Sequence, residues 1–239
     1  MSRNGDKNKT KAVRKTTGDV DAFLDKVAAA PKSVGTHGRG RLLFVMDATA
    51  SRAPTWDKAA HIQGEMFQKT ASLGGLSVQL AFYRGFGEFK VSQWTDNTAE
   101  LLRLMTSVQC LAGETQIAKV LSHARAENKK HKINAVVFVG DCVEEDIDKL
   151  GKLAGELGVL GIPVFMFQEG DDPVAAFAYQ QIATLSGGAY CRFDAGAAET
   201  LKKLLSAVAV YVAGGWQALE NHAGKSGSET KLIARQLRR

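Results

Sequence analysis

Three short segments of this sequence carry oxygen-bearing side chains at a spacing that suits a divalent cation. Asp47, Thr49 and Ser51 form a D-x-T-x-S pattern, Thr115 lies in a Gly-Glu-Thr-Gln segment, and Asp141 lies in Gly-Asp-Cys. Alternate residues of an extended turn project to the same side, so the first three side chains are directed at one point. Two carboxylates and three hydroxyls are hard oxygen ligands, which suit Mg²⁺, Mn²⁺ or Ca²⁺ rather than zinc.

The segments that must position these side chains alternate between strands and helices. Continuous apolar runs such as Leu42–Met46 are typical of strands buried on both faces. Strands are expected at 42–46, 77–83, 88–93, 133–139, 162–167 and 189–193. Apolar residues at helical spacing predict most of the helices. Helices are expected at 19–30, 56–72, 98–108, 115–129, 146–157, 173–185 and 197–213.

This order of elements predicts the α/β class: a Rossmann-like, open, mostly parallel six-stranded sheet with helices on both faces. Residues 84–87 are few enough to form a hairpin, which makes one edge strand antiparallel. Ligands of such sheets bind at the carboxyl ends of the central strands. Asp47 and Asp141 each follow a predicted buried strand, and Thr115 leads into a helix. We therefore expect the three segments to meet at one edge of the sheet.

Over about residues 40–213 the sequence resembles a von Willebrand factor type A (VWA) domain with a metal-ion-dependent adhesion site (MIDAS). The D-x-T-x-S segment matches the first motif of that family, Thr115 the second, and Asp141 the third. The run Leu-Ser-Gly-Gly-Ala-Tyr at 185–190 is similar to the family's stretch before the last strand. Two departures stand out, because position 49 is Thr where Ser is commoner, and Gly-Asp-Cys stands where Asp-Gly is usual.

The resemblance implies a binding site rather than a reaction centre, and therefore no enzyme activity. Thr49 and Ser51 would coordinate the metal directly, as would Thr115 in the ligand-competent state. Asp47 and Asp141 would act mostly through water or through hydrogen bonds to the other ligands. An Asp or Glu carboxylate of a partner protein would complete the shell of the cation. We therefore expect an intracellular adaptor or assembly factor.

The net charge of +6 belongs to the two ends of the chain. Residues 1–20 carry +4 and residues 220–239 carry +3, which leaves the middle of the chain close to neutral. Basic tails are most often solubilising arms, and less often they contact nucleic acid or an acidic partner. The predicted organisation is a disordered basic tail at 1–18, a short helix and linker at 19–40, the VWA domain at 41–213 and a flexible basic tail at 214–239.

The predicted compartment is the cytoplasm. Three widely spaced cysteines without a CxxC motif fit reduced thiols. The polar N-terminus lacks the apolar core of a signal peptide. The longest nearly apolar stretch, 204–216, is too short to span a bilayer.

Several other interpretations stay open. A haloacid-dehalogenase-like, Mg²⁺-dependent phosphatase would use Asp47 as its nucleophile, although Thr49 stands where such an enzyme needs an acid/base Asp. Asp47 and Thr115 could also simply cap a turn and a helix. Arg52 could steer an acidic ligand or be solvated, and Cys142 could be a redox-sensitive thiol or a small buried residue.

Overall fold

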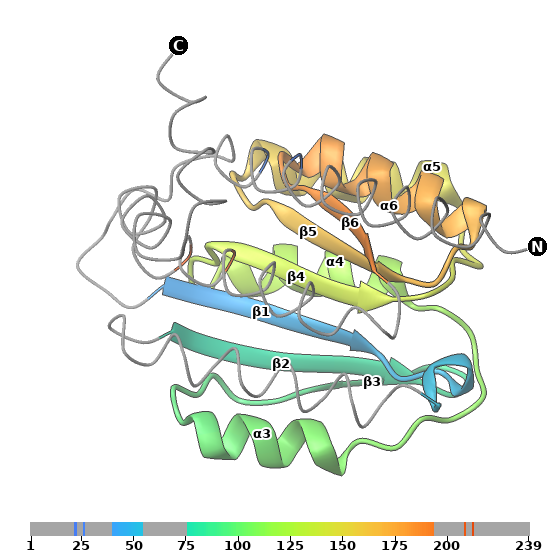
Figure 1. Ribbon diagram of the computed structural model, residues 1–239. Coiled ribbons are helices and arrows are strands. Elements are labelled where there is room, and N and C mark those ends of the chain that lie inside the picture. Colours follow the sequence, from blue (N-terminus) through green and yellow to red (C-terminus); the bar gives the residue numbers. More distant parts are fainter. Residues whose placement is uncertain are drawn as a thin grey trace, which may run out of the picture.

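The computed structural model describes residues 22, 26, 40–54, 76–193, 208 and 212. The strands are β1 (Gly40–Asp47), β2 (Leu76–Arg84), β3 (Glu88–Val91), β4 (Ala135–Gly140), β5 (Val164–Glu169) and β6 (Tyr190–Phe193). They form one six-stranded sheet in the order β3-β2-β1-β4-β5-β6 (Figure 1). β1 and β4, which lead to the two predicted metal-site aspartates, are therefore the two central strands.

All neighbouring strands run parallel except β2 and β3, which form an antiparallel hairpin. Their turn contains Gly85 at φ 59° and Gly87 at φ 97°, a left-handed backbone region that favours glycine. The predicted fold class, a mostly parallel open sheet with one antiparallel edge strand, is thus confirmed.

Helices connect the parallel strands. They are η1 (Ala50–Arg52, a single 3₁₀ turn), α3 (Thr98–Ser107), α4 (Ile117–Asn128), α5 (Ile147–Val159) and α6 (Pro173–Ser186). Asn97, Asp146 and Asp172 precede α3, α5 and α6, and their side chains accept hydrogen bonds from first-turn backbone N–H groups. No helix in the described part of the chain is both long and apolar enough to cross a membrane.

The sheet buries side chains on both faces. Leu42, Phe44 and Met46 of β1 lie in a core with apolar residues of α3, whereas Leu43 and Val45 point to the other face, toward α4, α5 and α6. This alternation follows from the two-residue period of a strand. Because both faces are covered, β1, β4 and β5 read as uninterrupted apolar runs in the sequence.

The predicted helices 98–108, 115–129, 146–157 and 173–185 and all six predicted strands are present, with ends shifted by at most about two residues. Other predictions lie outside the described residues. The helix at 56–72 lies wholly outside them. Of the helices at 19–30 and 197–213, the structure describes only residues 22, 26, 208 and 212. Val208 and Val212 are among those four, and both are buried in the core on the α3 face. The domain limits at 18, 40 and 213 stay predictions.

Candidate metal site

The two predicted aspartates lie next to each other at the carboxyl edge of the sheet. Asp47 is the last residue of β1, and Asp141 directly follows β4. The parallel register pairs Met46 with Val139, which brings the ends of the two strands side by side. Asp47, Asp141 and Cys142 offer ligand atoms that all lie within 4.8 Å of one another. The structure therefore brings together side chains far apart in the sequence, as the fold class predicts.

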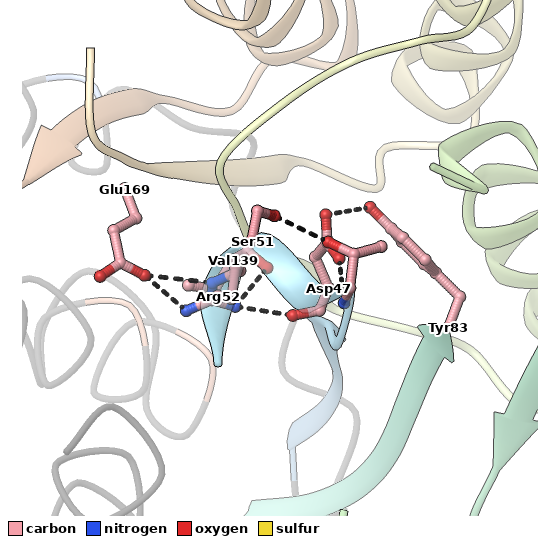
Figure 2. Close-up of polar contacts among 7 residues, drawn as sticks. Asp47, Ser51, Arg52, Tyr83, Val139 and Glu169 are labelled. Atoms are coloured by element: carbon pink, nitrogen blue, oxygen red, sulfur yellow. Dashed lines mark hydrogen bonds and ion pairs between the residues drawn. The ribbon is translucent and has the colours of Figure 1, made fainter. Parts of the chain in front are cut away.

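Asp47 is fully buried and held by two hydrogen bonds. Its Oδ1 accepts the backbone N–H of Thr49 at 2.8 Å, and its Oδ2 accepts the hydroxyl of Tyr83, on β2, at 2.9 Å (Figure 2). Burial raises the pKa of Asp47, while the hydrogen bonds from Thr49 and the charge of Arg52 act in the opposite direction. The two hydrogen bonds thus fix the orientation of the Asp47 carboxylate. Nearby positive charge does not fully offset the cost of burying its negative charge.

The two hydroxyls of the first motif converge. The Oγ1 of Thr49 and the Oγ of Ser51 are 3.1 Å apart, although the chain between them forms the η1 turn instead of an extended segment. Thr49 is buried and Ser51 is exposed, so Ser51 marks the solvent side of the site. The neighbouring backbone is fixed by Leu111, whose N–H donates to the carbonyl of Ala48 at 3.0 Å.

Arg52 has a role that neither alternative of the sequence analysis, steering an acidic ligand or simple solvation, describes. It neither meets solvent nor faces a ligand, because its side chain is only 1% exposed. Its Nε and Nη2 each lie 3.1 Å from Oε2 of Glu169, at the end of β5. Its Nη1 donates to the carbonyls of Asp47 and Val139 at 3.0 and 3.2 Å (Figure 2). One guanidinium therefore joins the carboxyl ends of β1, β4 and β5.

Thr115 lies against the loop that begins at Asp141. Its Oγ1 accepts the backbone N–H of Glu144 at 3.0 Å, and its own N–H donates to the Glu144 carboxylate at 2.9 Å. The carboxylate of Glu145 accepts the N–H groups of Ile117 and Ala118 and so caps α4. Thr115 is therefore not the cap of that helix. No spacing in the sequence signals this role of Glu145, because the residues that it caps lie far away along the chain.

The residues fit a divalent metal. Oδ1 of Asp141 is buried and has no hydrogen-bond partner among the described residues. A buried carboxylate oxygen without a partner is costly, and a bound cation would remove that cost. The surrounding donors are a second carboxylate, the hydroxyls of Thr49 and Ser51, and one thiol. Together they are the kind of donor set that binds divalent cations.

The thiol belongs to Cys142, whose place in the site the sequence analysis left open. Burial, together with the neighbouring carboxylates of Asp141 and Asp47, raises the pKa of this thiol. The backbone carbonyl of Cys142 accepts the Tyr179 hydroxyl at 2.9 Å. A Cβ at Gly140 would lie 2.7 Å from that same hydroxyl, which explains the glycine before Asp141.

Comparison with known proteins supports the fold. No family model matches the sequence, and no curated protein matches it. Among solved structures, the conserved hypothetical protein BatB from Bacteroides thetaiotaomicron is similar with a TM-score of 0.55 and 15% identity, over 71% of this chain and 98% of that chain. The SpRpn10 VWA domain is similar with a TM-score of 0.54 and 12% identity, over 72% of this chain and 95% of that chain.

A third similar structure contains a bound metal ion. Proximal thread matrix protein 1 (PTMP1) from the mussel byssus, with a zinc-occupied MIDAS motif, gives a TM-score of 0.56 and 14% identity. The match covers 72% of this chain and 45% of that chain. The fold of this protein is therefore that of a VWA domain, as the resemblance predicts. In this fold, Asp47 and Asp141 lie at the carboxyl edge of the sheet, and Thr115 is hydrogen-bonded to Glu144 in the loop that begins at Asp141.

Proposed function

We propose that this chain is a metal-dependent protein-interaction module, in which a divalent cation captures a carboxylate of a partner protein. The proposed metal site consists of Asp47, Thr49, Ser51, Thr115 and Asp141. The observation that carries the proposal is the buried, unpartnered Oδ1 of Asp141 beside the Asp47 carboxylate. The VWA fold, and a zinc-occupied MIDAS motif in the similar PTMP1, support it.

The chain's own residues prepare the site for an anionic guest. Tyr83 and the Thr49 N–H orient the Asp47 carboxylate, and the hydroxyls of Thr49 and Ser51 lie close enough to share one ion. When bound, the cation supplies an electrophilic open position. Neutral hydroxyls as direct ligands leave more of its charge available to a partner carboxylate than anionic ligands would. The exposure of Ser51 supports an open position that a partner protein can reach.

The finer parts of the proposal concern the ion, the partner and the compartment. Mg²⁺ is the proposed cation, with Mn²⁺ or Ca²⁺ as substitutes, because most donors are oxygen. The proposed setting is cytoplasmic, as an adaptor or assembly factor, and the three free cysteines of the described chain agree with a reducing compartment. Binding of nucleic acid or an acidic partner through the tails stays a separate prediction, since the tails lie outside the described residues.

The geometry of Asp47 favours an anchoring role over phosphatase chemistry. Its carboxylate is fully buried and both of its oxygens accept hydrogen bonds. An attacking carboxylate must reach the phosphorus of its substrate and is weakened as a nucleophile by such donors. We therefore expect no turnover of phosphomonoesters by the metal-loaded protein.

Calorimetric titration of metal-stripped protein with Mg²⁺ and Mn²⁺ tests the metal site. We expect saturable binding at one site in the wild type, and its loss in Asp47→Asn and Asp141→Ala. Asp171→Asn is the matched control, because Asp171 is an exposed carboxylate in the loop just after β5. Full binding by both site variants, in folded protein, would contradict the proposal.

A second measurement tests the capture of a carboxylate. Water-proton relaxation of the Mn²⁺-loaded protein reports water bound to the ion. We expect acetate, and more strongly an Asp-containing peptide, to displace that water in a saturable manner. A peptide with Asn in place of Asp is the control. Unchanged relaxation with every carboxylate would leave a metal site but remove the proposed mode of partner binding.

A further inference from the structure

The candidate site contains a sulfur atom where its main motifs provide only oxygen. The Sγ of Cys142 lies within 4.8 Å of ligand oxygens of both Asp47 and Asp141. The other two thiols of the described chain, Cys110 and Cys191, are not part of this group. The backbone of the loop that carries Cys142 is held from two directions.

The backbone on either side of the sulfur is fixed by specific contacts. Tyr179, fully buried in α6, donates its hydroxyl to the carbonyl of Cys142 at 2.9 Å. On the chain before it, Gly140 lies so close to Tyr179 and Phe138 that a side chain cannot fit there. Further along, the backbone N–H of Glu144 donates to the hydroxyl of Thr115, and the Glu144 carboxylate accepts the N–H of Thr115. The loop thus presents Asp141 and Cys142 to the same point.

We propose that Cys142 is a ligand of the metal, so that the site prefers a thiophilic divalent cation such as Zn²⁺ or Co²⁺ over Mg²⁺. This inference rests on the proposed function, because it concerns the ion held at the same site. Zinc binds sulfur, nitrogen and oxygen ligands together, whereas Mg²⁺ strongly prefers oxygen. Cys142 would add one sulfur donor to the oxygen donors of the site, and such a mixed set suits zinc.

A sulfur ligand still leaves an open position on the ion for a partner's Asp or Glu. Its negative charge would weaken capture of that carboxylate relative to a site with neutral direct ligands alone. In the similar PTMP1 structure, a MIDAS motif is occupied by zinc.

Titration of the metal-stripped full chain with Co²⁺ tests the sulfur ligand directly. A thiolate bound to Co²⁺ gives a near-ultraviolet charge-transfer absorption that oxygen ligands do not give. We expect this band to rise to one equivalent in the wild type and to disappear in Cys142→Ser. Cys110→Ser is the matched control, because Cys110 is another half-buried thiol of the described chain; this variant should keep the band.

Competition between Zn²⁺ and Mg²⁺ supplies the second readout. We expect Cys142→Ser to weaken the affinity for Zn²⁺ at least about tenfold while leaving Mg²⁺ binding within about threefold of the wild type. Cys142→Ala, which removes the donor without adding a hydroxyl, should weaken Zn²⁺ at least as much. Thermal unfolding followed by circular dichroism confirms that each variant is folded.

The outcomes separate this inference from the proposed function. If the cobalt band persists in Cys142→Ser, or if Zn²⁺ binds no more tightly than Mg²⁺ to the wild type, Cys142 is not a ligand and the inference is overturned. One-site Mg²⁺ binding that depends on Asp47 would still uphold the proposed function in that case. If no divalent cation binds to the folded wild type, both fail.

Discussion

At the scale of single residues, the candidate site depends on groups that hold the carboxylates in place. Tyr83 is the clearest, because its buried hydroxyl reaches Oδ2 of Asp47 from the neighbouring strand. Its hydroxyl donates to the Asp47 carboxylate at 2.9 Å. Its effect on metal binding therefore comes only through the orientation of Asp47.

Replacing Tyr83 by Phe should weaken both metal binding and the fold. The variant leaves one oxygen of a buried carboxylate without its donor, and hydrogen bonds to charged groups are worth about 1.5–3 kcal/mol. We expect a loss of that order in the free energy of unfolding in urea, with a several-fold weaker metal affinity. Tyr190→Phe is the control, because Tyr190 donates to Gln168 at 2.6 Å; it should change stability but not metal affinity.

His123 gives a pH dependence that is separate from the metal. Its Nε2 lies 2.9 Å from Oε1 of Gln79, and burial lowers its pKa below the usual 6.5. The unfolded chain therefore takes up the proton at a higher pH than the folded chain. Stability from this group is full above about pH 6.5 and declines as the pH falls toward the folded pKa.

The comparison of wild type with His123→Gln isolates this effect. Denaturation in urea at about pH 7.5 and about pH 5 should show a smaller loss of stability at low pH in the variant. An equal loss in both proteins would mean that His123 does not contribute. The other titrating groups are common to the two chains and cancel in the difference.

At the scale of elements, the buried Arg52–Glu169 pair holds three strand ends in register. Arg52 contacts the backbone of Asp47 and Val139 and the side chain of Glu169 (Figure 2). These contacts place the ends of β1, β4 and β5 relative to one another. The pair thus positions Asp47, at the end of β1, and Asp141, directly after β4.

Breaking this pair should be costly. Arg52→Met leaves the carboxylate of Glu169 buried without its partner, a change that typically costs about 3–5 kcal/mol. We expect lower stability and weaker metal binding, both measurable in the same samples. The half-exposed pair Arg125–Glu156 is the matched control, and Arg125→Met should cost less than about 1 kcal/mol. Equal effects of the two substitutions would contradict the positioning role.

The sequence predicted the elements well because both sheet faces are covered. Apolar runs such as 42–46 have one simple explanation, and the fold class places their carboxyl ends together. Asp47 and Asp141 could be found for this reason. Arg52 and Cys142 could not be assigned, because their roles depend on contacts with Glu169 and Asp47, far away along the chain. Side-chain pairing of that kind leaves no periodic pattern in the sequence.

At the scale of the whole molecule, metal binding should raise the thermal stability. A ligand at about one hundred times its dissociation constant stabilises the folded state by about 2.7 kcal/mol. For a chain of this size, each kcal/mol corresponds to about 2–4 °C in Tm. We therefore expect a chelator to lower Tm by about 5–10 °C in the wild type.

Asp141→Ala provides the control for that shift. This variant removes the buried Oδ1 that has no hydrogen-bond partner among the described residues. Its Tm should not respond to metal or to chelator. Its Tm in chelator should equal or exceed that of the metal-free wild type, because the unpartnered buried oxygen is gone. A chelator effect of equal size in both proteins would place the stabilising ion elsewhere in the chain.

The adjacency of β1 and β4 has a consequence for the lifetime of the folded state. Asp47 and Asp141 stand at the ends of paired central strands that are far apart along the chain. An ion shared between them would close a large chain loop, as a disulfide does, but reversibly. The strand ends would then separate only after the ion leaves. The dissociation rate of the metal would then set an upper limit on how fast the loaded domain unfolds.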